Sequence, residues 1–297
     1  MYFIQQNRGK KSLCLDFKKS DGIALLHARI PHVDVVIENY GPGVMERRGL
    51  DYESLKQINA KIIMCSVSAF GRTGSLSHLT GYDYIAQGFS GIMHMTGDPD
   101  GPPRFVGVAI ADGIAGVSAF GAPGYALLHS ERTGQGQHIG ISMADSLYHL
   151  QSVEVPAFAA SKGKYKPMRF GLHHYASCPL GVFKSAEIYF VILALNRQWP
   201  NVAKPLGKPE LIKDPPFATS KARGKNQTEL IAMIEKWLQD FPTDEAALKA
   251  LADHRVPAGP CALDRRNSRT PVLYGPQHGT SGSGSNTRGR NHPGVGV

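Results

Sequence analysis

Two hydrophobic periodicities alternate along the first seventy residues, and this alternation constrains the fold more than any other feature of the chain. Segments with the length and apolar content of β-strands alternate with segments whose apolar residues recur at helical spacing. In chain order they are strand, helix, strand, helix and strand, at residues 12–17, 21–30, 33–38, 50–59 and 61–68. This order predicts an α/β fold, in which helices cover a parallel sheet.

Ligands of parallel sheets bind beyond the carboxyl ends of the strands. Two glycine-containing turns occupy such positions here, "NYGPG" at 39–43 and "SAFGRTG" at 68–74. Glycine lets a backbone approach a ligand closely, although glycine is also common in ordinary tight turns. Both turns are therefore candidates for the rim of a binding site.

A lone carboxylate, Asp112, lies in the otherwise uncharged segment 106–120, which is rich in Gly, Ala, Val and Ile. Two interpretations fit this residue: a side chain that caps the start of a helix, or a poorly solvated and therefore reactive group. The segment alone favours neither. Pro123 lies in the helix predicted to follow, and we expect it to kink that helix.

The pattern changes after residue 145. Residues 162–179 are basic, aromatic and rich in Pro and Gly, which is typical of a connector. A strand at 188–195 and helices at 226–241 and after Thr243 then predict a compact α+β unit. The predicted helix N-caps are Ser20 or Asp21, Asp51, Thr228 and Thr243. We predict a large domain, a linker, a small α+β domain and a disordered tail, at residues 1–160, 161–183, 184–263 and 264–297.

The formal net charge of +9 favours an anionic ligand. Five arginines and one aspartate from Asp264 onward contribute +4 of this charge. The chain has no zinc-finger spacing, RNP-like aromatic motif or basic heptad region, so we predict no nucleic-acid partner. It also lacks the dinucleotide fingerprint, the Walker loop and the H-E-x-x-H and G-x-S-x-G motifs.

The four cysteines are far apart and include no C-x-x-C pair, which is typical of reduced thiols in a cytoplasmic protein. The first residues are too polar for a signal peptide, and the longest apolar run, 188–195, is too short for a membrane span. His173 and His174 are adjacent and cannot share a helical face, so we predict no metal site. We thus expect a cytoplasmic protein without a membrane partner.

Seven stretches occur together in one order, at residues 7–18, 34–55, 66–74, 81–103, 108–116, 131–147 and 255–260. Together they resemble the family III CoA-transferases, which include formyl-CoA transferase and carnitine-type CoA-transferases, and the related α-methylacyl-CoA racemases. The number and order of the stretches carry the resemblance, which covers roughly residues 7–263. It implies a Rossmann-like large domain without the dinucleotide fingerprint, and two chains interlocked in a homodimer.

The resemblance also implies that coenzyme A lies across the large domain as a substrate, with no tightly bound cofactor. The diphosphate and ribose phosphate of CoA suit a basic protein. Alone, Lys10 and Arg47 would pass for ordinary solvated cations. The positions that match family CoA contacts are Asn7, Lys10, Asn39, Tyr40, Gly41 and Arg47.

By the same resemblance, Asp112 matches the catalytic aspartate of the family. The implied reaction moves CoA from an acyl-CoA to a small carboxylic acid through aspartyl anhydrides and an aspartyl-CoA thioester. A poorly solvated carboxylate is the better nucleophile, which gives the apolar surroundings a purpose. Tyr82, Asp83 and Gly113 are candidate substrate-pocket residues.

Two alternatives remain. The racemases pair the equivalent aspartate with the histidine of a Gly-His-Asp segment, whereas Tyr82 stands there in this chain. A phenol with a pKa near ~10 is a poor base at neutral pH, which favours the transferase. The second alternative is an inactive, truncated relative. The chain begins after the first strand–helix–strand unit of the family, and the sequence after Arg265 resembles a shifted reading frame, so we expect an incomplete fold.

Overall fold

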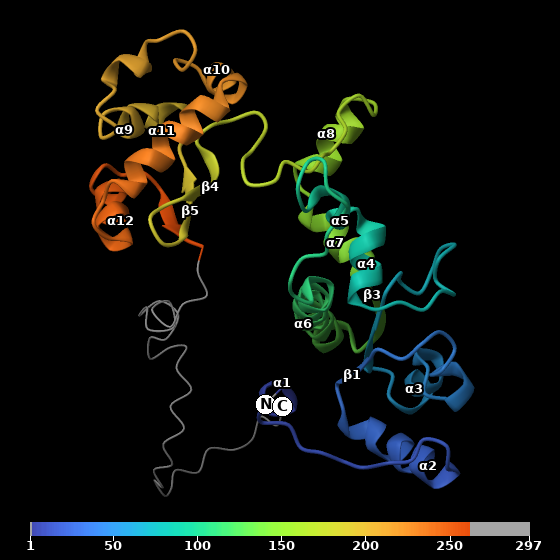
Figure 1. The fold of residues 1–297 in the computed structure, drawn as a ribbon. Helices are drawn as coiled ribbons and strands as arrows, with labels where there is room; N and C mark the ends of the chain where they lie inside the picture. The colour runs from blue at the N-terminus through green and yellow to red at the C-terminus, as the bar shows by residue number, and fades with distance from the viewer. Residues whose placement is uncertain (1, 262–297) are drawn as a thin grey trace, which may run out of the picture. The chain divides into compact units, whose positions relative to one another are not determined.

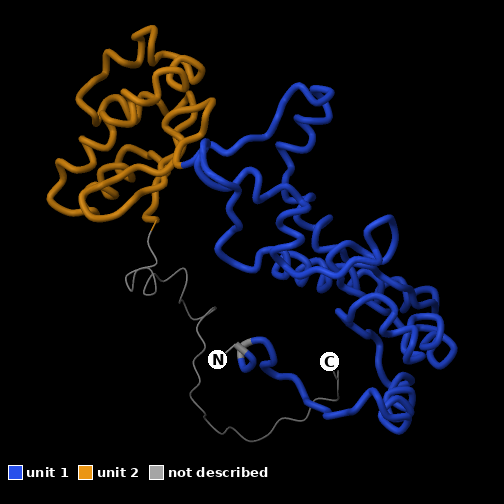
Figure 2. The backbone as a smooth tube through the Cα atoms, turned by 45° about the vertical axis from the view of Figure 1, so that its right-hand side comes forward, with its two compact units in different colours: residues 1–171 blue, residues 172–297 orange. Residues whose placement is uncertain are grey.

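The structure is a computed structural model that describes residues 2–261, and its elements can be followed in Figure 1. The chain divides into two compact units between Gly171 and Leu172 (Figure 2). This division falls inside the predicted linker, 161–183. The predicted disordered tail, 264–297, lies outside the described residues. Within the described residues, no helix is both long and apolar enough to cross a membrane.

The first unit contains a parallel sheet, which confirms the predicted α/β class. Its strands are β1 (Val35–Glu38), β2 (Ile63–Ser68) and β3 (Gln137–Ser142), in the spatial order β1-β2-β3. Ile37 lies beside Cys65, and Cys65 lies beside Ile139. All three strands therefore end at the same edge of the sheet. β1 and β2 confirm the second and third predicted strands.

The predicted strand at 12–17 is wrong, because these residues form no ladder in the structure. A strand forms only where its backbone N–H and C=O groups pair with a neighbour, and alternation of side chains supplies no neighbour. Here the segment runs into a turn in which the Lys18 N–H donates to the Asp16 carboxylate at 2.9 Å. The third strand of the sheet is β3, which the periodicity did not single out.

Helices cover the two faces of this sheet. On one face, Met64 belongs to a hydrophobic cluster with Leu55 and Ile30. On the other face, a second cluster contains Ala69, Ala111 and Leu147. The α-helices of the unit are α1 (Tyr2–Gln6), α2 (Ser20–Arg29), α3 (Tyr52–Ile58), α4 (Asp83–Ser90), α5 (Ile92–Met95), α6 (Ile110–Thr133), α7 (Met143–Leu150) and α8 (Glu154–Ala160). The short 3-10 helices are η1 (Ile30–His32) and η2 (Glu46–Arg48).

The longest helix, α6, packs against β2 and β3 through a stripe of small residues. This stripe recurs at helical spacing and consists of Ala111, Ala115, Ala119, Pro123, Ala126 and Ser130. The helix is continuous through Pro123, and the expected kink stays a prediction. At its far end, the Ser130 hydroxyl donates to the Lys61 carbonyl at 3.1 Å. Gly136 then lies so close to β2 that a Cβ atom there would overlap the carbonyl oxygen of Ile62.

The second unit is a three-stranded antiparallel sheet with helices, which matches the α+β pattern predicted for this part of the chain. Its strands are β4 (Leu180–Lys184), β5 (Tyr189–Leu193) and β6 (Ala258–Pro260). The helices are α9 (Trp199–Ala203), α10 (Ser220–Lys225), α11 (Gln227–Gln239) and α12 (Asp244–Asp253), with 3-10 helices η3 (Asn196–Gln198) and η4 (Pro209–Ile212). β4 begins within the predicted linker.

Two of the predicted N-caps are confirmed. The Asp51 carboxylate accepts the Ser54 N–H at 3.1 Å, and the Thr243 hydroxyl accepts the Ala246 N–H at 3.2 Å. The other two are wrong, because α2 and α11 begin after Lys19 and Asn226, and neither side chain makes a capping bond.

A buried cation organises the core of the second unit. Arg223 is 0% exposed, and its guanidinium carbon lies 4.7 Å from the ring centre of Trp199. Three of its nitrogens donate to neutral oxygens: the carbonyls of Cys178 at 2.7 Å and Phe217 at 2.9 Å, and the Asn196 amide at 2.7 Å. One side chain thereby ties together α10, η3 and the segments before β4 and α10.

Candidate functional site

Asp112 lies in the first turn of α6, where it is exposed to solvent. It borders two hollows, of about 360 and 580 Å³. The smaller lies between β1 and α6 and is lined by Ile37, Glu38, Asn39, Val67, Asp112, Gly116, Ala119 and Phe120. The larger includes Asp112, Gly113, Gly116 and Phe120 in its lining. The lone carboxylate therefore stands where the open face of α6 meets the carboxyl end of β1.

Two glycines keep the approach to Asp112 open. A Cβ atom added at Gly113 or Gly116 would have no atom within 4 Å. One turn further along the helix, the Phe120 side chain is 85% exposed and lines both hollows. The helix surface beside Asp112 thus combines backbone that a ligand can reach with an apolar ring that it can contact.

Asp112 does not cap α6. The buried carboxylate of Asp83, at the start of α4, performs that role from a distant part of the chain. Its Oδ2 accepts the Ala111 N–H at 2.7 Å and the Asp112 N–H at 3.0 Å. Its Oδ1 accepts from the Gln87 amide at 2.6 Å. Protein groups bond to both oxygens, and the role of Asp83 as a substrate-pocket residue stays a prediction.

The electrostatic setting of Asp112 follows from this arrangement. Although the residue as a whole is exposed, neighbouring protein atoms remove part of the water around the carboxylate and so raise the pKa of Asp112, and the negative charge of Asp83 raises that pKa further. A carboxylate with a raised pKa is more basic, and hence a stronger nucleophile once it is ionised. Of the other two predicted pocket residues, Gly113 follows Asp112 on the open helix face, and Tyr82, 84% exposed, lies directly before α4.

The predicted CoA contacts fall into two groups. Asn39 and Tyr40 follow β1, and Asn39 lines the same hollow as Asp112. Tyr40 lines a neighbouring hollow of about 270 Å³, and Gly41 continues the same turn. Arg47 is exposed in η2, with its guanidinium against Gly43.

Asn7 and Lys10 form the second group. They lie in the segment before α2, where the Asn7 amide donates to the Phe3 carbonyl at 2.9 Å. Lys10 is exposed. The structure thus brings Asn39 to the hollow beside Asp112, and it shows local contacts for Asn7.

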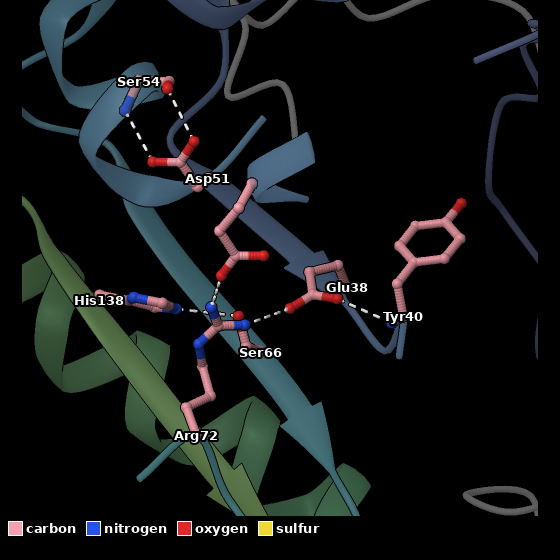
Figure 3. A network of polar contacts seen from close by, with 8 residues as sticks. Glu38, Tyr40, Asp51, Ser54, Ser66, Arg72 and His138 are labelled. Atoms are coloured by element: carbon pink, nitrogen blue, oxygen red, sulfur yellow. Dashed lines mark hydrogen bonds and ion pairs between the residues drawn. The ribbon is translucent and has the colours of Figure 1, made fainter. Parts of the chain in front are cut away.

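A polar network that the sequence did not reveal fixes the turn after β1 (Figure 3). The buried Glu38 accepts the Tyr40 N–H at 2.7 Å, and its other oxygen lies 3.6 Å from Arg72. Arg72 also pairs with Glu46. Arg72 lies far from Glu38 and Glu46 in the chain, so only the pairing of β1 with β2 brings it to them.

The same network includes a partly buried histidine. His138 of β3 shares a hydrogen bond of 2.9 Å with the Ser66 hydroxyl and stacks on Tyr52 (Figure 3 shows the His138–Ser66 pair). Burial lowers the pKa of His138, and the charge of Arg72 lowers it further. His138 is therefore a neutral partner of Ser66 near neutral pH.

His173 and His174 do not combine with other ligands. His173 packs edge-on to Phe183, with the ring centres 4.8 Å apart, and burial lowers the pKa of His173. Residues 2–261 contain no group of three His, Cys, Asp or Glu side chains placed to hold a metal ion.

Known proteins are similar to this chain in sequence and in fold. The profile of CoA-transferase family III matches residues 1–271. The succinate–glutarate CoA-transferase of Agrobacterium fabrum is 37% identical over 270 residues, which are 87% of this chain and 64% of that protein. The acetyl-CoA:oxalate CoA-transferase of Acetobacter aceti is 39% identical over 263 residues, which are 88% of this chain and 67% of that protein.

A solved structure of a CaiB/BaiF family protein from Brucella suis superposes with a TM-score of 0.77 at 36% identity, over 92% of this chain and 70% of that one. The chain spans about two thirds of the length of these relatives, 64% of the Agrobacterium enzyme. The match along the sequence and the shared fold lead to one conclusion: the chain belongs to CoA-transferase family III.

Proposed function

We propose that this chain transfers coenzyme A from an acyl-CoA to a carboxylic acid, with Asp112 as the nucleophile. One observation carries the proposal: an exposed carboxylate with a raised pKa stands in the first turn of α6, beside glycines that leave its approach open. Membership of the family supports the reaction class.

Four steps account for the transfer. An Asp112 oxygen attacks the thioester carbon, the C–S bond breaks, and CoA leaves as the thiolate from an aspartyl–acyl anhydride. The thiolate attacks the aspartyl carbonyl, which gives an aspartyl-CoA thioester and releases the donor acid. The acceptor carboxylate then attacks this thioester and expels the thiolate again. Finally the thiolate attacks the acceptor's carbonyl, which yields the new acyl-CoA and restores Asp112.

The open surface around Asp112 suits these steps. The open backbone at Gly113 lets a thioester carbonyl approach without meeting a side chain. Asn39 lines the smaller hollow together with Asp112, which supports a contact between Asn39 and the bound thioester.

The remaining CoA contacts follow from the chemistry of the ligand. Its phosphates suit Arg47 and Lys10, and its polar groups suit Asn7 and the turn formed by Tyr40 and Gly41. The relatives named above act on succinate, glutarate and oxalate, so small dicarboxylates are the acceptors to test first. The interlocked homodimer and the cytoplasmic location stay predictions.

Asp112→Asn tests the proposal, because it keeps the shape of the side chain and removes the nucleophilic oxygen pair. We expect transfer between succinyl-CoA and glutarate or oxalate to fall by about 10⁴-fold or more, as for other nucleophile deletions. Asp145→Asn is the matched control, since Asp145 is also an exposed carboxylate in the first turn of a helix. Hydroxylamine in the presence of acyl-CoA should modify Asp112 and leave Asp145 unmodified.

Retained turnover in Asp112→Asn would rule out the nucleophilic role. Uptake of deuterium at the α-carbon of 2-methylacyl-CoA, dependent on Asp112, would instead indicate a racemase. The exposed phenol of Tyr82 argues against that outcome, because a phenol is a poor base near neutral pH. A folded chain that binds CoA without transferring it would indicate an inactive relative.

A further inference from the structure

Two side chains one turn apart on α4 connect the helix to the segment that carries Asp112. Asp83 is 7% exposed and Gln87 is 0% exposed, and they bond to each other at 2.6 Å. Asp83 also accepts the first N–H groups of α6, from Ala111 and Asp112. Two buried polar residues on one helix thus hold the start of another.

Gln87 holds the chain just before α6. Its Oε1 accepts the Val106 N–H at 2.9 Å, and its Nε2 donates to the Val108 carbonyl at 3.3 Å as well as to Asp83. Gln87 and Asp83 together therefore form hydrogen bonds with the backbone at residues 106 and 108 and again at 111 and 112. These contacts enclose the turn from which Asp112 projects.

The neighbouring groups fix the orientation of the Gln87 amide. The Val106 N–H requires an acceptor, so the carbonyl oxygen of the Gln87 amide must face it and the NH₂ group must face Asp83. The N–H groups of α6 also require an acceptor. Position 83 therefore has donors on both sides, which a carboxylate satisfies and an amide does not.

We propose that Asp83 is a positioning residue for the transfer reaction, oriented by Gln87, and that it holds the first turn of α6 and so sets the direction of Asp112. The proposal rests on the proposed nucleophilic role of Asp112. Asp83 itself does not touch substrate, because its oxygens are occupied within the protein.

The charges around Asp112 allow a specific readout. The negative charge of Asp83, on α4, raises the pKa of Asp112. From the end of β1, Glu38 borders the same hollow, but Arg72 pairs with it. Removal of the Asp83 charge should therefore lower the pKa of Asp112 and move the acid limb of the kcat/KM profile to lower pH.

Asp83→Asn is the primary variant, assayed in the full chain. We expect kcat to fall by about 10²-fold with KM little changed, because the nucleophile is misplaced while the CoA contacts remain. The acid limb should move to lower pH. Amide hydrogen exchange in peptides that span residues 106–117 should become faster. Asp145→Asn should change none of these quantities.

Gln87→Glu in the Asp83→Asn background is the rescue. The amide introduced at position 83 then accepts the α6 N–H groups and donates to the carboxylate introduced at position 87. That carboxylate also accepts the Val106 N–H, so both bonds of position 83 and the bond to Val106 are matched again, and only the 3.3 Å bond to the Val108 carbonyl is lost. We expect slow exchange to return at residues 106–117 and kcat to recover at least 10-fold over the single variant.

The outcomes separate the two proposals. If Asp112→Asn retains turnover, the proposed function fails whatever Asp83 does. If Asp112→Asn is inactive while Asp83→Asn keeps the wild-type rate, pH profile and exchange, the role of Asp83 is refuted. A loss of folded protein in Asp83→Asn, with a wild-type pH profile in the folded fraction, refutes it too. A folded rescue variant that restores neither rate nor exchange does the same.

Discussion

Arg223→Met should strongly destabilise the second unit. Methionine fills much of the same volume and keeps an apolar contact with Trp199, but it has no donor. The oxygens of Cys178, Phe217 and Asn196 then lose the bonds of 2.7–2.9 Å that Arg223 supplies. The cation–π contact with the Trp199 ring, 4.7 Å away, is lost as well.

The size of the loss follows from these contacts. A buried acceptor left without a donor costs about 1–3 kcal/mol, and the cation–π contact contributes roughly 0.5–2 kcal/mol. Release of a desolvated charge, worth several kcal/mol, offsets part of this sum. We expect a net fall of about 3–5 kcal/mol in the free energy of unfolding, a large share of the ~5–15 kcal/mol typical of a domain.

Tryptophan fluorescence measures this effect selectively, because both tryptophans of the chain, Trp199 and Trp237, lie in the second unit. With an m-value of roughly 1 kcal/mol/M in urea, the midpoint of the fluorescence transition should fall by about 3–5 M. If the unit starts with less stability than that, the variant will be unfolded without urea.

Lys225→Met is the matched control, since Lys225 is an exposed cation in the same helix, α10. It should move the midpoint by less than ~0.5 M, as surface substitutions usually do. An Arg223→Met midpoint that matches the control would refute the claim that the buried guanidinium holds this core together.

Two further predictions concern the first unit. Gly136→Ala should destabilise it by about 3 kcal/mol, the upper end of the usual range for overpacking, because the new Cβ would overlap the Ile62 carbonyl; a urea melt followed by circular dichroism measures this, with Gly124→Ala as the unhindered control. Asp112→Asn should raise the stability of the unit at neutral pH while it abolishes transfer. The folded state raises the pKa of Asp112, so its favourable contribution is present in acid and is lost as the pH rises through that value. The gain over wild type should therefore vanish in acid, and a gain that is equally large there would contradict the cause assigned to it.

Local patterns predicted the part of the sheet whose strands are apolar and short. β1, β2, α2 and α3 follow from side-chain periodicity, because each contributes apolar side chains to one hydrophobic cluster. The segment at 12–17 shows the limit of this reasoning: it alternates like a strand, yet in the structure it pairs with none. β3 pairs with β2 over a separation of more than seventy residues, for example Ile139 with Cys65. No local pattern encodes that pairing.

In the candidate site, too, some features follow from the local sequence and others depend on contacts between distant segments. The isolation of Asp112 was visible in the sequence, and so were the glycines beside it. The role of Asp83 was not, because the bond from the Asp112 N–H to Asp83 joins residues 29 positions apart. Sequence placed Asp83 near the site, but only the fold shows that its carboxylate bonds to Gln87 and to the first turn of α6. The Glu38–Arg72 pair was hidden for the same reason.

Hydrogen bonds to other parts of the unit restrain α6 at both of its ends. Asp83 grips its first turn, and the bond from Ser130 to the Lys61 carbonyl ties its last turns to the loop before β2. A helix of 24 residues is about 36 Å long, so these supports are far apart and resist rotation of the whole rod. These bonds restrict the movement of Asp112, so under the proposed function we expect adjustment to acids of different length to come from the surfaces around it. A search for altered substrate preference should vary the turn at Asn39–Gly41 and the ring of Phe120, and should leave the supports of the helix unchanged.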